Sequence, residues 1–165
     1  MPNWCSNTIH LDGKKEHRQE FVDKNKGFRV WDTTKKEEYY DLSFNASVKM
    51  PNSIRDKHKR NIRNDEWYGW CNKNWGTKWE AQDTNLEHTD DYTYYSFETA
   101  WGFPEAWLIR VSRIYPHIKF NVEWAEEGGC GGRFMMQGGE CFYTHNKSSK
   151  EWRDYMGYED NEDDF

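Results

Sequence analysis

The sequence is poor in aliphatic residues and has no long apolar run. Hydrophobic residues of all kinds make up 35% of its 165 positions. No apolar run approaches the roughly 20 residues that a membrane-spanning helix needs. The first residues, MPNWCSN, lack a basic stretch followed by an apolar one, so we expect no secretory signal. These absences predict a cytoplasmic protein with reduced thiols and no membrane partner.

The chemical motifs of several enzyme classes are also missing. The four cysteines form no CxxC pair and the six histidines are scattered, so we expect neither a metal site nor a cofactor. The phosphate loop GxxxxGK[ST] is absent, as are GxGxxG after a strand, GxSxG and HExxH. No histidine begins the HxT or HxS motif of ferredoxin-like phosphodiesterases. Enzymatic activity is therefore disfavoured.

Charge is distributed unevenly along the chain. Residues 159–165 hold five acidic residues and no basic one, and we interpret residues 151–165 as a solvated acidic tail. Without those five, 24 acidic residues face 23 basic ones, out of a formal net charge of −6. A body so close to neutral lacks the extended basic face that long nucleic acid requires.

Aromatic residues are present in excess. Ten Trp, ten Tyr and nine Phe mean that the core must be built from rings, whose polar edges need hydrogen-bond partners. A domain of this size buries a limited number of large side chains. We therefore expect most rings to be core and the surplus to be free for a planar ligand.

The first half of the chain predicts a strand, a helix and an insertion. Residues 6–11 alternate as a strand, and residues 14–25 form an amphipathic helix closed by Gly27. An insertion over residues 28–64 follows, with a short strand at 42–48. Its basic part, residues 52–64, has too few apolar anchors for a well-buried helix and should lie on the surface. It is either a solvated insertion or an arm that contacts anions.

The second half alternates helices and strands. A short helix over residues 65–74 brings rings to the core, with Trp75 packed inward. Strands follow at 78–86 and 92–100, joined by a turn at 88–91, and Tyr94 and Glu98 share one face of the second strand. Residues 104–115 form an apolar-striped helix and 118–124 a strand, and residues 133–136 and 140–143 form a further hairpin broken by two glycines.

The order of these elements predicts an α+β fold. Without the insertion and the last hairpin it reads βαββαβ, the ferredoxin-like plan, in which an antiparallel sheet carries its helices on one face. We expect a single domain over residues 1–150. A homo-oligomer stays open, because the added strands leave sheet edges that can pair.

Four spaced motifs carry a family resemblance. MPNWCSN, NWGTKW, FETAWGFPEAW and YPHIKFNVEWAEEGG, spread from Pro2 to about Gly132, resemble the YubB-type ferredoxin-like family of bacteriophages and plasmids. The resemblance implies the fold and a mobile-element setting. It implies no activity and no catalytic residues.

Rings and cations at the ends of elements are the candidate binding residues, because bases stack on rings and Arg or Lys binds phosphate. They are Trp79, Lys78, Trp101, Trp107, Arg110, Arg113 and Arg133. If Lys78 and Trp79 lie on one strand they face opposite sides, which weakens them as a joint site.

The favoured function is a non-enzymatic counter-defence protein that sequesters a small, cyclic nucleotide signal. One alternative is a protein that inhibits a host enzyme by direct contact, through the acidic tail or an exposed aromatic patch. A phosphodiesterase-like enzyme acting on a nucleotide messenger is the other.

Overall fold

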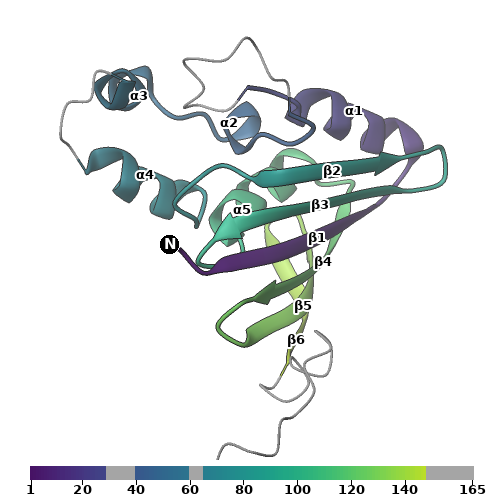
Figure 1. Ribbon diagram of the computed structural model, residues 1–165. Coiled ribbons are helices and arrows are strands. Elements are labelled where there is room, and N and C mark those ends of the chain that lie inside the picture. The colour runs from purple at the N-terminus through teal and green to yellow at the C-terminus, as the bar shows by residue number, and fades with distance from the viewer. Residues whose placement is uncertain (29–39, 60–64, 148–165) are drawn as a thin grey trace, which may run out of the picture.

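The computed structural model describes residues 1–28, 40–59 and 65–147, which form one antiparallel sheet with helices (Figure 1). The six strands are β1 (Trp4–Asp12), β2 (Gln82–His88), β3 (Thr93–Ala100), β4 (Lys119–Glu126), β5 (Cys130–Gln137) and β6 (Glu140–Lys147). The helices are α1 (Lys15–Asn25), α2 (Phe44–Ser47), α3 (Asn52–Lys59), α4 (Glu66–Asn74) and α5 (Glu105–Ile114).

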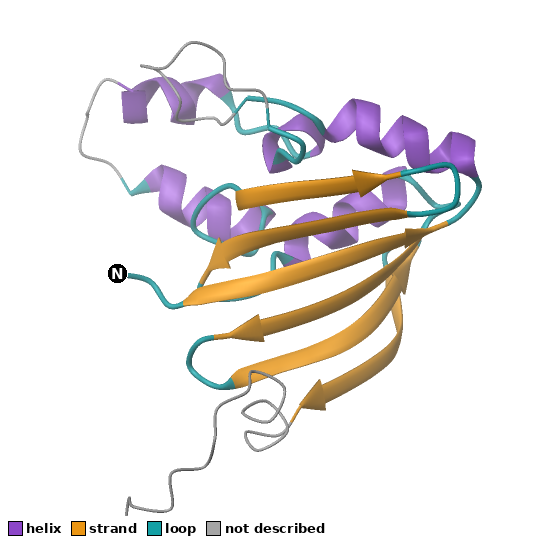
Figure 2. Ribbon diagram, turned by 45° about the vertical axis from the view of Figure 1, so that its right-hand side comes forward, coloured by secondary structure: helices purple, strands orange, loops and turns teal. Residues whose placement is uncertain are grey.

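The strand order confirms the predicted α+β, ferredoxin-like plan. Neighbouring strands run β2-β3-β1-β4-β5-β6, so the first four follow the βαββαβ topology and the last hairpin extends the sheet beyond β4. Both hairpin strands are longer than the sequence predicted. Figure 2 shows the helices gathered on one side of the sheet and the opposite face open.

Alternation along the strands decides which side chains reach the core. In β1, Asn7, Ile9 and Leu11 are buried beneath the helices, whereas Thr8 and His10 point to the open face. In β3, the face opposite to Tyr94 is likewise buried. The sheet therefore has one apolar face and one polar face.

Aromatic rings fill the space between sheet and helices. Phe44 lies between Trp75, at 5.9 Å between ring centroids, and Trp107, at 4.7 Å. Both tryptophans have 0% exposure, which confirms the inward packing of Trp75. Its indole N–H donates to the Val48 carbonyl at 2.9 Å. A second group of edge-to-face rings surrounds Phe21.

The strand predicted at residues 42–48 is wrong, because Phe44–Ser47 is the short helix α2. The carboxylate of Glu80, buried to 1% exposure, accepts hydrogen bonds from the Phe44 and Asn45 amides and from the Ser43 hydroxyl. These are the amides that a helix start leaves unbonded. A residue 36 positions away in sequence thus caps this helix.

The strand predicted at residues 78–86 begins later, at Gln82. Gly76 has a positive φ of 84° and turns the chain after α4, and the Thr77 hydroxyl donates to the Ala100 carbonyl. Because Glu80 turns inward to cap α2, Lys78 and Trp79 lie in a bend before the strand. The sequence pattern of residues 78–81 therefore does not indicate a strand.

The basic stretch forms helix α3, and its described side chains from Asn52 to Lys57 are exposed or partly buried, as predicted. Residues 60–64 of that stretch lie outside the described residues. So do residues 29–39 of the insertion and the predicted acidic tail.

We expect Glu80→Gln to destabilise the domain. An amide side chain has one acceptor oxygen, and its NH2 group would face the backbone N–H groups that the carboxylate now binds. Hydrogen bonds to a charged group contribute about 1.5–3 kcal/mol each, so we expect a loss of about 2 kcal/mol in the free energy of unfolding. Urea unfolding followed by circular dichroism measures it.

The control is Glu140→Gln on the exposed first residue of β6. It should change the free energy of unfolding by no more than about 0.5 kcal/mol. Equal effects of the two substitutions would contradict the capping role of Glu80.

Candidate functional site

A hollow lies on the open face of the sheet. This face is the one turned away from the helices (Figure 2). The volume of the hollow is about 520 Å³, within the range of small-molecule sites. Residues of β1, β3, β4 and β5 line it: Thr8, His10, Tyr94, Asn121, Val122, Glu123, Arg133, Phe134 and Met135. Of the predicted site residues, only Arg133 is among them.

Arg133 is held in place by an ion pair. It belongs to β5, which includes the strand predicted over residues 133–136, and it stands directly opposite Glu123 of β4. Its Nε lies 3.2 Å from one Glu123 oxygen and its Nη2 3.4 Å from the other. The Nη2 contact is a hydrogen bond and the Nε contact an ion pair, and together they orient the guanidinium group toward Glu123. Among the described residues, no further hydrogen bond of the Arg133 side chain is found.

The strand register places a ring and an imidazole in the next row of the hollow. Tyr94 of β3 is opposite His10 of β1, and His10 is opposite Asn121 of β4. Asn121 is in turn opposite Met135 of β5. This row gives an aromatic face, two polar groups and an apolar side chain across four neighbouring strands.

Glu98 and Glu123, both on the open face, lie in different rows of the sheet. Glu123 is opposite Thr8, whereas Glu98 is opposite Ser6, one row further along β1. Burial, aided by Asp83 and Glu127, raises the pKa of Glu98. Glu123 remains tied to Arg133.

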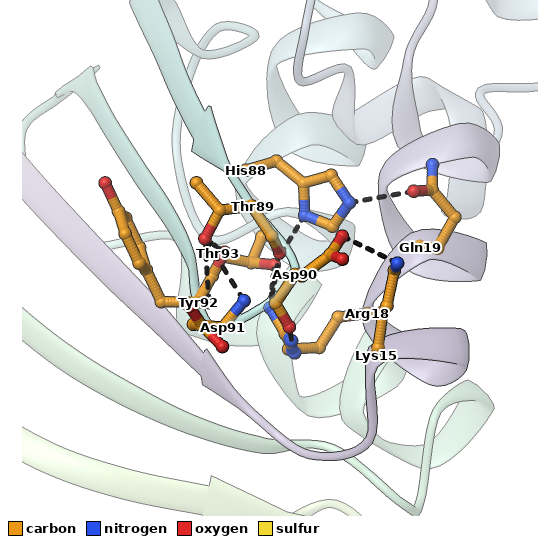
Figure 3. A network of polar contacts seen from close by, with 9 residues as sticks. All are labelled: Lys15, Arg18, Gln19, His88, Thr89, Asp90, Asp91, Tyr92 and Thr93. Carbon is orange, nitrogen blue, oxygen red and sulfur yellow. Dashed lines mark hydrogen bonds and ion pairs between the residues drawn. The ribbon is translucent and has the colours of Figure 1, made fainter.

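A buried arginine fixes the hairpin that carries Tyr94 (Figure 3). Arg18 of α1 is 3% exposed and donates to the carbonyls of Gly13, Thr89 and Asp90 and to the Thr93 hydroxyl. The carbonyl bonds hold the β2–β3 turn against the start of α1. The Thr93 bond, 2.9 Å long, fixes the residue next to Tyr94.

The same network fixes the tautomer of His88 (Figure 3). The Gln19 side-chain oxygen only accepts, so His88 Nε2 carries the proton, at 2.9 Å. The Nδ1 atom then accepts from Thr93, 2.7 Å away. Burial, followed by the charge of Arg18, lowers the pKa of His88.

Lys78 and Trp79 meet, contrary to the prediction that they face opposite sides. The Lys78 ammonium lies 4.4 Å from the centroid of the Trp79 ring. Trp79 also packs on Trp4, at 6.1 Å between centroids. The bend before β2 places both side chains together, and the Trp79 ring is already covered by groups of its own chain.

The two other tryptophans predicted to bind a ligand differ in exposure. Trp107 is fully buried against Phe44, so its ring cannot reach a ligand, and its prediction as a binding residue is corrected. The apolar stripe of α5 that includes it is the core face of that helix. Trp101 is 56% exposed, but it lies on the helix side of the sheet rather than in the hollow.

The arginines of α5 also lie apart from the hollow. Arg110 and Arg113 are exposed on the outer surface of the helix. The Arg113 side chain occupies the place that a Cβ on Gly139 would take, and so covers the β5–β6 turn. The predicted binding residues therefore lie in different parts of the protein and do not form one site.

Sequence reasoning missed His10, Thr8 and Tyr94 as site residues. Their alternation was readable, and the shared face of Tyr94 and Glu98 was predicted. Only the register, in which Tyr94 faces His10, shows that these residues surround Arg133.

Two general features of the described ranges concern membranes and metals. Within residues 1–28, 40–59 and 65–147, no helix is long and apolar enough to cross a membrane. The same ranges contain no group of three or more His, Cys, Asp or Glu side chains placed to hold a metal ion.

Comparisons with known proteins identify relatives of the fold. A family model described as a ferredoxin-like domain in Api92-like protein matches residues 74–164. The crystal structure of the protein api92 from Yersinia pseudotuberculosis is similar to this chain with a TM-score of 0.61 at 7% identity. The match covers 90% of this chain and 99% of that one, and at such identity it concerns the fold alone. No curated protein matches the chain.

We expect the free energy of unfolding to decrease as the pH is lowered, because His88 has a lowered pKa in the folded protein. A histidine whose pKa is lowered by folding binds fewer protons in the native state than in the unfolded one. Its stabilising contribution is complete above the unfolded pKa of about 6.5 and is lost as the pH falls below that value. Urea unfolding between pH 7.5 and 5.5 measures the slope.

His88→Gln should flatten that slope. His145→Gln, on the exposed face of β6, serves as the matched control and should leave the slope as it is. A wild-type slope that persists in His88→Gln would contradict this assignment.

Proposed function

Since the chain belongs to the family of ferredoxin-like domains in Api92-like proteins, we propose that it is a non-enzymatic binding protein for a small nucleotide. The ligand occupies the hollow on the open sheet face. The observation that carries the proposal is the guanidinium of Arg133, oriented by Glu123, in one hollow with the ring of Tyr94. A nucleotide has the two complementary parts, a phosphate and a flat base.

The dimensions of the hollow support a ligand of nucleotide size. Tyr94 and Arg133 belong to strands separated by β1 and β4. With strands about 4.8 Å apart, their backbones are roughly 14 Å apart across the sheet. Two long side chains leaning into such a gap leave room for a base and a sugar, whereas a free phosphate would contact only the arginine.

Binding without turnover is supported by the state of the nucleophiles. Burial raises the pKa of the Cys5 and Cys71 thiols to about 12. Burial, with Glu126 as the neighbouring acid, also raises the pKa of Cys130. Thiols in these states are weak nucleophiles. The ion pair of Glu123 with Arg133 suits a positioning role better than that of a general base.

The biological role follows from the mobile-element setting that the four sequence motifs imply. A protein that holds a cyclic nucleotide messenger of bacterial defence tightly, without destroying it, would act as a counter-defence protein. We also propose that these four motifs relate the chain to the YubB-type family of bacteriophages and plasmids. A nearly neutral body, with Arg133 as the only arginine or lysine among the residues that line the hollow, favours a small messenger over a polymer.

We expect Arg133→Gln to weaken nucleotide binding. Purified full chain is titrated by calorimetry with adenosine monophosphate and with a panel of cyclic di- and trinucleotides. Loss of charge-assisted hydrogen bonds should weaken binding of the best ligand by about ten- to a hundredfold. Arg110→Gln, on the outer surface of α5, is the matched control and should bind as the wild type does.

The proposal fails if no nucleotide of the panel binds, or if Arg110→Gln and Arg133→Gln weaken binding equally. Appearance of a hydrolysed product after long incubation would instead favour the enzymatic alternative.

A further inference from the structure

A second hollow, the Trp101 slot, lies on the helix side of the sheet at the start of α5. Its volume is about 330 Å³. It is lined by Trp101, Gly102, Phe103, Glu105, Trp124, Cys130, Phe134, Cys141 and Thr144. Four of these residues are aromatic, and Phe103 and Phe134 contact each other edge to face at 5.1 Å between centroids. The slot is thus walled by rings from a loop, β4 and β5.

The exposed ring of the slot is held at a conformational cost. Trp101 has a φ of 74°, a left-handed conformation that bulky side chains rarely adopt. Its amide donates to the Asn3 carbonyl at 2.9 Å, and the Thr99 hydroxyl donates to the Gly102 carbonyl at 2.7 Å, so the loop is fixed on both sides. Glycine would fit this position without strain. A strained and exposed tryptophan is a feature typical of binding sites.

The electrostatics of the slot favour a cation. Glu105 lines it, and the Cys130 thiol, which also lines it, donates to the buried Glu126 carboxylate at 3.5 Å. No lysine or arginine lines the slot among the described residues. The amides of Glu105 and Trp107 at the start of α5 already donate to the carbonyls of Phe103 and Trp75, so they are not available to an anion.

We propose that the Trp101 slot binds the guanidinium group of an arginine side chain from a partner protein. A guanidinium is planar, stacks on aromatic faces and pairs with a carboxylate through two parallel hydrogen bonds. The slot supplies both elements, in Trp101 with its neighbouring rings and in Glu105. This interaction is independent of the nucleotide hollow, which opens on the other face.

The test compares two peptides that differ only in charge. The full chain is titrated with acetyl-Gly-Arg-Gly-amide and with the same peptide in which neutral citrulline replaces arginine, and the indole N–H resonances are followed by NMR. We expect the citrulline peptide to bind about tenfold more weakly or not at all. Choline serves as a third ligand, because it presents a cation without a planar fork.

Two variants locate the binding. Trp101→Gly removes the ring but retains a residue suited to the backbone conformation, and it should abolish binding of the arginine peptide. Glu105→Gln should weaken that peptide by about two- to fivefold and leave the citrulline peptide unchanged. Tyr68→Ala, which removes a ring 46% exposed on α4, is the matched control and should bind normally, as should Arg133→Gln.

Three results would overturn the proposal. The first is equal affinity for the arginine and citrulline peptides, including binding of neither. The second is unchanged binding of the arginine peptide by Trp101→Gly. The third is choline binding as tightly as the arginine peptide, which would assign the slot to a small quaternary ammonium compound instead.

Discussion

The packing of Phe44, Trp75 and Trp107 against one face of the sheet is the interaction on which the rest of the structure depends. With few aliphatic side chains available, these rings supply much of the buried apolar surface. They require every helix to lie on the same side. No described helix covers the other face of the sheet, and most side chains on that face are polar. An open and rigid face is thus a consequence of how the core is filled.

Strand β5 contributes to both candidate sites because successive side chains of a strand point to opposite faces. Arg133 lines the hollow on the open face, and the next residue, Phe134, contacts Phe103 on the helix side. The first four strands would make a complete ferredoxin-like sheet without β5. The added hairpin therefore extends the minimal fold by one cation on the open face and one ring beside Trp101.

The sequence was sufficient for the fold wherever local pattern and tertiary environment agree. Alternation in residues 92–100 and the apolar stripe of α5 predicted these elements because a half-buried strand and a helix packed on one side impose those periods. It failed at Phe44 and at Trp79, where the buried carboxylate of Glu80 reorganises two segments at once. Such a contact between distant residues has no local signature. The hollow on the open face was only partly predictable for the same reason. Strand register, which brings Tyr94 and Arg133 to one hollow, has no local signature either.

The distribution of acids on the open face sets a limit on ligand length. Glu98 lies one row beyond Thr8, away from Tyr94, and the influence of Asp83 and Glu127 on its pKa places further acids near it. A polyanion that followed β1 past Arg133 would bring its next phosphates toward this acidic end, where repulsion opposes binding. A ligand confined to the row of Tyr94 and the row of Arg133 stays away from Glu98, and the acids of those rows, Glu87 and Glu123, contact Tyr92 and Arg133. If a phosphate group binds beside Arg133 as proposed, the acids around Glu98 oppose the binding of a longer chain of phosphates.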